Sequence, residues 1–340
     1  MIELDNIILD DEGIKKVLII GLGQLGLPVA RYVREKGFDT YGYDISIAAM
    51  ERAQKIAGIK AVTDFSEIDA FIICVSTHKT DDMSTPQIEG LLSVVLEISM
   101  KAKNGALVSI ESTIPRGTSK KVFEMLNHRL HVAHVPHRFY SLEEKDHGVN
   151  QVRVVGGMCD CCLKAATQFY SGRVDMDTSS TNIITINHSI NDDAYNNMMN
   201  LGIPLHCVSN IEIAEITKIA ENAHRYLQIA FAEDLYLYCQ ANDIDFAELR
   251  VALNTKWNVD ILEPRDGIGG HCLPKDTKMF LQSSQSSRKS KILTAALKVD
   301  QDYRRYRKIR GTAIEQTVPE QLIVPDLRGE VLQSEIRHAV

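Results

Sequence analysis

The sequence lacks a hydrophobic run long enough to cross a membrane, and its first residues do not resemble a signal peptide. They include Glu3, Asp5, Asp10 and Asp11, whereas a secretory signal begins with basic residues followed by an apolar stretch. Basic charge is also in short supply, because 38 Lys and Arg face 45 Asp and Glu, for a formal charge of −7. This balance argues against broad binding to nucleic acid or to membrane surfaces. We therefore expect a cytoplasmic protein.

The sequence also lacks the even number of cysteines that is typical of a secreted protein held together by disulfide bonds. The chain has seven cysteines, and an odd number in a chain of this size suits a reducing compartment. Cys159, Cys161 and Cys162 are close enough in sequence to suggest a metal site. No second ligand pair with zinc-like spacing accompanies them. A structural or incidental role is favoured, and we expect no metal.

A strand and a glycine-rich turn lie near the start of the chain. The apolar residues 16–20 lead into the turn Gly21-Leu22-Gly23-Gln24-Leu25-Gly26, a helical pattern follows, and the next strand ends at Asp44. This order is the dinucleotide-binding fingerprint, in which Gly21 allows the turn, Gly23 admits the pyrophosphate and Gly26 lets helix and strand pack. We expect the pyrophosphate at the helix N-terminus. Asp44 should accept from the ribose hydroxyls, which favours NAD over NADP.

Strands and helices alternate through the first half, which predicts an α/β fold with a doubly wound, mostly parallel sheet. Ligands of such sheets lie beyond the carboxyl ends of the strands. Polar groups occur at three such ends: Val75-Ser76-Thr77, Ser112-Thr113 and Pro136-His137-Arg138. Each could be only a helix cap, but their recurrence favours contact with cofactor or substrate.

The second half changes to helices. Residues 211–240 contain no Pro or Gly and carry apolar residues at helical spacing. One small domain cannot bury so much apolar surface, so we expect a homodimer that pairs this helix with a second copy. Lys218 and Asn222 share a face of the helix, which Arg225 continues, although a lysine there is usually solvated. We divide the chain into residues 1–205 (cofactor domain), 206–302 (helical, dimerisation) and 303–340 (tail).

One cysteine follows a glycine turn in the segment Gly269-Gly270-His271-Cys272-Leu273-Pro274-Lys275-Asp276. Pro274 suits the first turn of a helix, and a helix N-terminus together with Lys275 favours the thiolate of Cys272. Asp276 supplies a carboxylate that could handle a proton or a water. The segment suits a nucleophilic cysteine. The alternative is a buried, inert cysteine, as most cysteines outside disulfides are.

These motifs together resemble the nucleotide-sugar 6-dehydrogenases, the UDP-glucose and GDP-mannose dehydrogenase family. The resemblance runs from about residue 16 to about residue 301 and rests on residues 21–28, 111–118, 214–222 and 269–276. It implies a nucleotide-sugar substrate whose C6 alcohol is oxidised to a carboxylate in two hydride transfers to NAD⁺.

The resemblance also implies roles for single residues. Cys272 would attack the C6 aldehyde to give a thiohemiacetal, then a thioester that water hydrolyses. Lys218 and Asn222 would stabilise the oxyanion, Asp276 would handle the water, and Thr113 would lie near the nicotinamide. Contacts with the substrate are expected from Arg138, Lys218, Asn222, Arg225, Gly269, Gly270 and Lys275.

Two features depart from the family pattern. His137 stands where the family usually has a glutamate, so we expect either a group that titrates near neutral pH or a change in substrate or thioester hydrolysis. We also expect the family's third domain to be absent, because few residues follow the central segment. A basic segment there could bind substrate phosphates, or it is a solvated helix face; its residues are Arg304, Arg305, Arg307, Lys308 and Arg310.

Two other functions stay open. A two-electron hydroxyacid or sugar dehydrogenase can use a lysine on the central helix but needs no nucleophilic cysteine. A non-catalytic NAD-binding relative would need neither Cys272 nor Lys218. The sequence does not identify the sugar.

Overall fold

The computed structural model describes residues 13–79, 81–82, 84–139, 148–172, 183–184, 199–284 and 290–317. The chain divides into two compact units, the first of Met1–Lys79 and Gln87–Lys218 and the second of Thr80–Pro86 and Ile219–Val340. Most of the predicted tail, residues 318–340, lies outside the described residues. The predicted domain boundaries at residues 205 and 302 stay predictions.

The first unit contains a sheet that has nine strands in the described residues, in the order β3-β2-β1-β4-β5-β6-β7-β9-β8. Pairing from β3 to β6 is parallel and follows the strand order of dinucleotide-binding folds. β7 is antiparallel to β6, β9 is parallel to β7, and β8 is antiparallel to β9. The predicted doubly wound, mostly parallel sheet is confirmed. The strands are β1 (Lys16–Ile20), β2 (Asp39–Tyr43), β3 (Lys60–Ala61), β4 (Ala70–Ile73), β5 (Leu107–Ile110), β6 (His131–His134), β7 (Arg153–Gly157), β8 (Ile183–Ile184) and β9 (Leu205–Cys207).

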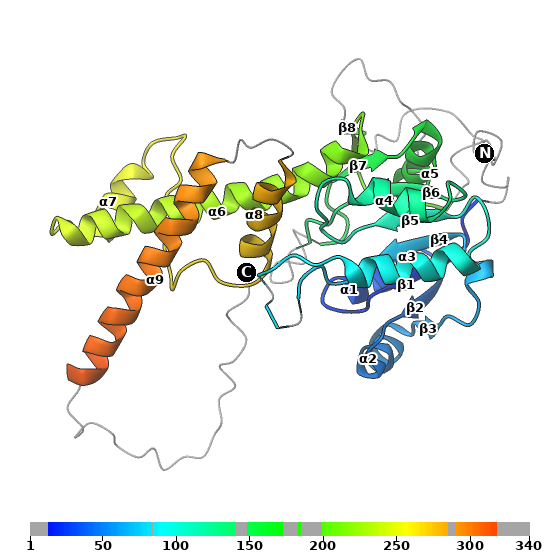
Figure 1. Ribbon diagram of the computed structural model, residues 1–340, viewed down its shortest axis with the longest axis horizontal. Helices are drawn as coiled ribbons and strands as arrows, with labels where there is room; N and C mark the ends of the chain where they lie inside the picture. The colour runs from blue at the N-terminus through cyan, green and yellow to red at the C-terminus, as the bar shows by residue number, and fades with distance from the viewer. Residues whose placement is uncertain are drawn as a thin grey trace, which may run out of the picture. The chain divides into compact units, whose positions relative to one another are not determined.

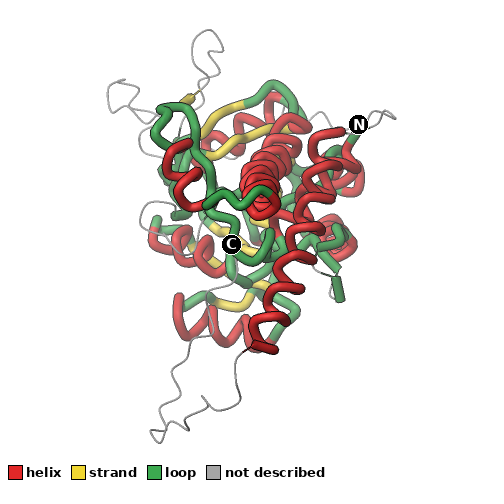
Figure 2. Tube along the Cα trace, turned by 90° about the vertical axis from the view of Figure 1, so that its left-hand side faces the viewer, coloured by secondary structure: helices red, strands yellow, loops and turns green. Residues whose placement is uncertain are grey.

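Helices cover both faces of this sheet, so that strands lie between helices (Figures 1 and 2). Val17 and Ile19 of β1 belong to the core beneath α1, α2 and α5. Leu18 and Ile20 belong to the core beneath α3 and α4. Because successive strand residues point to opposite faces, a strand buried on both sides reads as one apolar run. The helices are α1 (Gly26–Glu35), α2 (Ile47–Ala57), α3 (Glu89–Lys101), α4 (Thr118–Met125) and α5 (Asp160–Ser171).

The helix α6 (Ile211–Ala241) begins in the first unit and continues into the second, where α7 (Phe246–Leu253), α8 (Cys272–Ser283) and α9 (Lys291–Thr317) follow. Tyr226 and Ala230 of α6 share a core with Leu273 of α8 and Ala296 of α9. Further along, α6 packs against α7 in a second small core. The predicted long helix is confirmed, and α9 continues through residues 302 and 303, where the sequence analysis places a boundary.

No helix of the described part of the chain is both long enough and apolar enough to span a membrane.

Candidate functional site

The glycine turn between β1 and α1 fits a dinucleotide. A Cβ on Gly21, whose φ is +88°, would lie 2.7 Å from the carbonyl oxygen of Cys74. A Cβ on Gly26 would lie 1.7 Å from the carbonyl oxygen of Gly21, whereas one on Gly23 would have no described atom within 4 Å apart from its chain neighbours. No side chain caps α1 at Leu25. The first and third glycines are therefore required by packing, and the second leaves backbone and helix N–H groups open to the pyrophosphate.

Asp44 is held beside this turn at the end of β2. Its Oδ2 accepts from the Leu22 N–H at 2.7 Å, and its Oδ1 accepts from the Ser46 N–H at 2.8 Å. Gln24 is exposed on the turn. Arg52, which the sequence reasoning missed, donates to the Leu22 carbonyl at 3.1 Å. The carboxylate thus lies at the strand end where the fold places the adenosine ribose.

Replacing Asp44 should change cofactor selectivity. We expect Asp44→Ala to weaken NAD⁺ binding about tenfold or more, since a hydrogen bond to a charged group contributes about 1.5–3 kcal/mol, and so to narrow the preference over NADP⁺. Asp44→Asn keeps the size and one acceptor, and it isolates the effect of charge. Binding of NADH and NADPH, followed by fluorescence, gives the ratio. Equal use of both cofactors by the unmodified protein would contradict the assignment.

The polar ends of β4 and β5 lie side by side, because these strands pair. The Thr77 hydroxyl donates to the Thr113 carbonyl at 2.7 Å, and the Ser112 hydroxyl donates to the Val75 carbonyl at 2.7 Å. These two buried hydroxyls therefore fix the two loops to each other. Ser76 is exposed and Thr113 half-buried, which leaves them as the candidates for ligand contact.

A buried polar network at the end of β5 was not predicted from the sequence. Glu111 Oε1 lies 2.7 Å from Arg153 Nη1 and accepts from the Tyr170 hydroxyl at 2.5 Å, and its Oε2 lies 2.6 Å from His137 Nε2. Burial favours a raised pKa for Glu111, but the Arg153 charge outweighs it with help from His137 and Tyr170, and the pKa falls to about 2. A charged residue inside the otherwise apolar run of β7 was the signal that could have revealed this network.

His137 belongs to this network, and the expectation that it titrates near neutral pH is wrong. Burial lowers its pKa to about 4, with the charge of Arg153 as the next cause, while Glu111 opposes the shift. The Lys218 charge lowers this pKa further. The lowered pKa favours the neutral imidazole at pH 7, with Nε2 close to the Glu111 carboxylate. The predicted catalytic part of His137 stays a prediction.

Two buried histidines should make the fold sensitive to acid. His134, whose Nδ1 lies 2.9 Å from the Ile110 carbonyl oxygen, has its pKa lowered to about 3, chiefly by burial, and His137 to about 4. Below pH 6.5 the two imidazoles therefore bind protons in the unfolded chain but stay neutral in the folded chain. Above pH 6.5 these two histidines do not reduce the free energy of unfolding. As the pH falls from 6.5 toward 4, each histidine lowers that free energy by up to about 1.4 kcal/mol per pH unit.

Chemical unfolding between pH 7.5 and 4.5 measures that slope. The variant His134→Asn keeps a donor near the Nδ1 position and removes the titrating group. The slope of its unfolding free energy against pH should therefore be smaller, by an amount that corresponds to about one bound proton. His224→Gln, on the exposed face of α6, is the control and should leave the slope unchanged. An identical slope in wild type and His134→Asn would argue against a buried neutral imidazole.

The N-terminal turns of α6 are locked in place by Glu215. This buried carboxylate accepts from the backbone N–H groups of Gly117 at 2.6 Å and Ser119 at 2.7 Å, at the start of α4. Burial raises the pKa of Glu215 against these hydrogen bonds. Lys218 lies one turn later and is half-buried, so the same lock fixes the base of the lysine side chain.

In the second unit, Cys272 is the first residue of α8, as the sequence predicts. The preceding His271 makes no side-chain cap on this helix. Cys272 is exposed, and a helix N-terminus stabilises negative charge on its sulfur. Exposure and a helix N-terminus are two conditions that favour a nucleophilic cysteine, and the catalytic role of Cys272 stays a prediction.

Asn222 and Asp276 are in contact, and Asp276 is buried. Asp276 Oδ2 accepts from Asn222 Nδ2 at 2.5 Å, and its Oδ1 lies 2.7 Å from Lys275 Nζ. Asp276 is 1% exposed and Lys275 4% exposed. A buried carboxylate needs such partners, so Asp276 holds Asn222 and Lys275 in place. The predicted parts of Asp276 in handling water and of Lys275 in binding substrate stay predictions.

The other predicted substrate residues belong to both units. Arg138 donates to the Val152 carbonyl at 2.9 Å in the first unit. In the second unit Arg225 is exposed and Gly269 and Gly270 lie on the exposed turn before α8, Gly270 with φ of +70°. Their part in binding stays a prediction.

The basic segment of α9 makes contacts within its own unit. These are Arg304 with Asp300 at 3.0 Å, Arg305 with Asp302 at 3.5 Å, Arg307 with Asp266 at 2.9 Å and Arg310 with Gln240 at 2.9 Å. The segment is therefore better described as a helix face with local ion pairs than as a phosphate site. Tyr303, at its start, is buried and donates to the Arg265 carbonyl at 2.7 Å.

Two family models match the chain. One, the NAD-binding domain of the UDP-glucose/GDP-mannose dehydrogenase family, covers residues 53–173, and the other, the central domain of the same family, covers residues 212–302. The first match confirms the predicted NAD cofactor.

Similar proteins carry related names. A UDP-N-acetyl-D-mannosamine dehydrogenase of Methanococcus maripaludis is 27% identical over 82% of this chain and 64% of its own length. A protein of the same name from Campylobacter jejuni is 28% identical over 84% of this chain and 71% of its own. The solved UDP-D-ManNAc dehydrogenase of Pyrococcus horikoshii shares the fold, with a TM-score of 0.69 at 23% identity, over 88% of this chain and 72% of that one. The chain thus spans somewhat less than two thirds of the length of the Methanococcus relative.

Proposed function

Because the chain belongs to the UDP-glucose/GDP-mannose dehydrogenase family, we propose that it oxidises the C6 alcohol of a nucleotide sugar to the carboxylate with NAD⁺. The observation that carries the proposal is Cys272, exposed at the first turn of α8. A two-electron dehydrogenase on this scaffold has no use for such a cysteine. The names of the similar proteins favour a UDP-N-acetylhexosamine as substrate.

Two NAD⁺ molecules, bound one after the other, would each accept one hydride from C6. The first oxidation leaves an aldehyde, and the Cys272 thiolate adds to its carbon to form a thiohemiacetal. After the second oxidation the same carbon is a thioester. Water adds to it and the C–S bond breaks, so that the carboxylate leaves and the thiolate is restored. The covalent bond retains the aldehyde while the spent cofactor exchanges.

Three residues support this chemistry. Lys218 supplies positive charge to the oxygen of C6 as it becomes an oxyanion. Asn222 has two amide N–H donors. One of them is bonded to Asp276, which fixes the orientation of the amide, and the other would donate to the same C6 oxygen. Asp276 acts through Asn222 and Lys275 and is a positioning residue.

The test is the ratio of NADH formed to sugar consumed. Purified protein is incubated with NAD⁺ and, in turn, UDP-N-acetylmannosamine, UDP-N-acetylglucosamine, UDP-glucose and GDP-mannose. Two NADH per sugar and a uronate product are expected with one of the UDP-N-acetylhexosamines. One NADH and a carbonyl product would favour the two-electron dehydrogenase. Tight NADH binding without turnover of any sugar would favour the non-catalytic relative.

We also propose that the protein is a homodimer through the second unit. Large apolar side chains there are exposed, among them Phe231 at 57% and Tyr238 at 56% on α6 and Val251 at 66% on α7. Phe231 and Tyr238 are seven residues apart and therefore share a face of α6, and an exposed apolar face often marks an interface. The wild type should sediment as a dimer, and Phe231→Asp should dissociate it, whereas Glu124→Gln at an exposed position of the first unit should not. A wild type that stays monomeric at micromolar concentration would refute the interface.

A further inference from the structure

The turn that leads into α5 brings three cysteines together. Cys159 is the N-cap of this helix, and its sulfur accepts from the Cys162 N–H. The Cys159 sulfur lies 2.7 Å from that of Cys161 and 3.1 Å from that of Cys162. Cys162 is buried, Cys161 half-buried and Cys159 exposed. Three sulfur atoms thus converge at one helix end.

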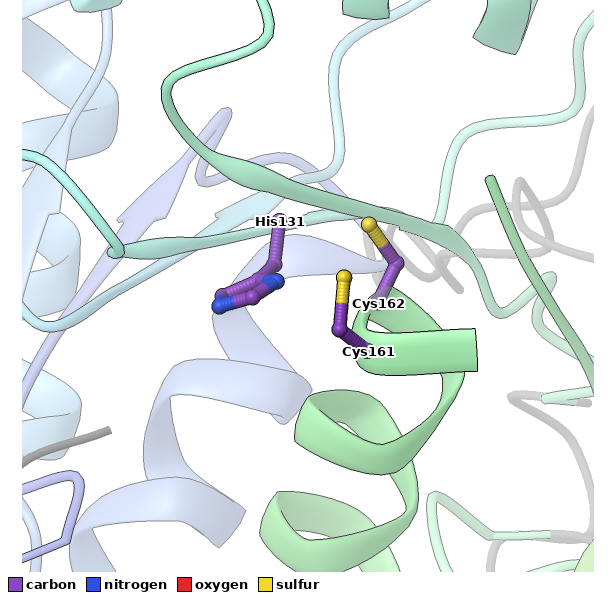
Figure 3. Close-up of side chains that lie close together, drawn as sticks. All are labelled: His131, Cys161 and Cys162. Atoms are coloured by element: carbon purple, nitrogen blue, oxygen red, sulfur yellow. The ribbon is translucent and has the colours of Figure 1, made fainter. Parts of the chain in front are cut away.

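The sheet topology supplies a fourth ligand that sequence spacing did not reveal. β7 runs antiparallel to β6, with Gly157 opposite Ala133, so the residues after β7 return to the start of β6. His131 begins that strand and is buried. One ring nitrogen of His131 and the sulfurs of Cys161 and Cys162 all lie within 4.8 Å of one another (Figure 3).

We propose that His131, Cys161 and Cys162, joined by Cys159, bind a thiophilic divalent cation of the Zn²⁺ class. Three cysteines and one histidine form a standard closed, tetrahedral zinc set, and sulfur and imidazole ligands select against Mg²⁺ and Ca²⁺. Zn–S bonds of about 2.3 Å in a tetrahedron separate sulfurs by about 3.8 Å. Binding of the ion with Cys159 as the fourth ligand therefore requires the sulfurs of Cys159 and Cys161, 2.7 Å apart, to separate by roughly 1 Å.

The surroundings of the cluster suit the thiolates that a metal requires. The Cys162 sulfur also accepts from the Val132 N–H at 3.3 Å, and the N-terminus of α5 offsets the excess negative charge.

The proposed site is structural. Four protein ligands leave no open position for substrate. The ion ties β6, which leads to His134 and His137, to α5, which carries Tyr170 of the buried network. The site is separate from Cys272 and does not rest on the proposed dehydrogenase activity.

The experiment uses the full chain under reducing conditions. Metal-free protein is titrated with Co²⁺, whose tetrahedral thiolate complexes absorb strongly in the visible, and then with Zn²⁺ to displace it; bound zinc per chain is measured by mass spectrometry. We expect one ion per chain, a thiolate–cobalt spectrum, and a melting temperature several degrees higher with Zn²⁺. Cys161→Ser, at a half-buried position, and His131→Asn should each lose most of this binding.

Cys207→Ser is the matched control, because Cys207 lies in the same unit outside the cluster, and it should bind like the wild type. The proposal is overturned if the wild type gives no thiolate–cobalt spectrum, or if Cys161→Ser and His131→Asn, shown by circular dichroism to be folded, bind as the wild type does. A Cys159–Cys161 or Cys159–Cys162 disulfide found by peptide mapping of the freshly purified protein, with no zinc bound, would also overturn it in favour of a redox pair.

Discussion

Cys272→Ser is expected to abolish uronate formation and to leave NAD⁺ binding unchanged. A serine hydroxyl stays protonated at neutral pH without a strong neighbouring base and does not attack an aldehyde as a thiolate does. The cofactor groups, Gly21, Gly23, Gly26 and Asp44, are untouched in another part of the chain. We expect overall turnover to fall by at least about a thousandfold, which corresponds to about 4 kcal/mol of lost stabilisation of the transition state.

Product analysis and cofactor binding distinguish the loss of a nucleophile in Cys272→Ser from a general loss of structure. The variant should bind NADH with the wild-type Kd, measured by fluorescence, while a uronate assay gives little product. Cys239→Ser, a second cysteine in the helical unit that lies in a small core far along α6, is the control and should keep normal turnover in folded protein. Uronate formation at a near-normal rate by Cys272→Ser would end the covalent scheme.

Much of the fold could be predicted because its signals are local. Glycine is required at both ends of the turn from Gly21 to Gly26, because a Cβ at either end would overlap the backbone. The extent of α6 follows from the absence of helix breakers and from its apolar spacing. Cys272 could be placed at a helix start because Pro274 marks the first turn.

The parts that were missed depend on strands that pair across the sheet. Glu111 meets Arg153 only because β5, β6 and β7 are neighbours, and no spacing along the chain encodes that contact. The same limit applies to His131, which joins the cysteines through an antiparallel strand. The burial of Asp276 could not be predicted for another reason, since a motif gives the residue type but not how deeply it is buried.

The second large effect should come from the buried pair of Glu111 and Arg153. Both side chains are at most 1% exposed, and Arg153 also donates to the Val149 carbonyl at 2.9 Å. Arg153→Met fills similar space but leaves the Glu111 carboxylate buried without its cation. Breaking a buried pair in this way costs about 3–5 kcal/mol. For a chain of this size that should lower the melting temperature by roughly 4–7 °C.

A second substitution shows whether the lost charge pair is the cause. Glu111→Gln removes the carboxylate that Arg153→Met strands, so the double variant should be more stable than Arg153→Met alone by about 1–3 kcal/mol. The exposed pair of Lys60 and Asp39, 3.4 Å apart, is the control, and Lys60→Met should change stability by less than about 1 kcal/mol. Thermal and urea unfolding at pH 7.5 measure all four proteins. If Arg153→Met unfolds within about 1 kcal/mol of the wild type, or if Glu111→Gln adds to its defect instead of relieving it, the carboxylate does not depend on this arginine. The end of β5 would then have to be held by Tyr170 and His137, by the Ser112 hydroxyl and by the backbone hydrogen bonds of residues 111 and 112 to Ile73.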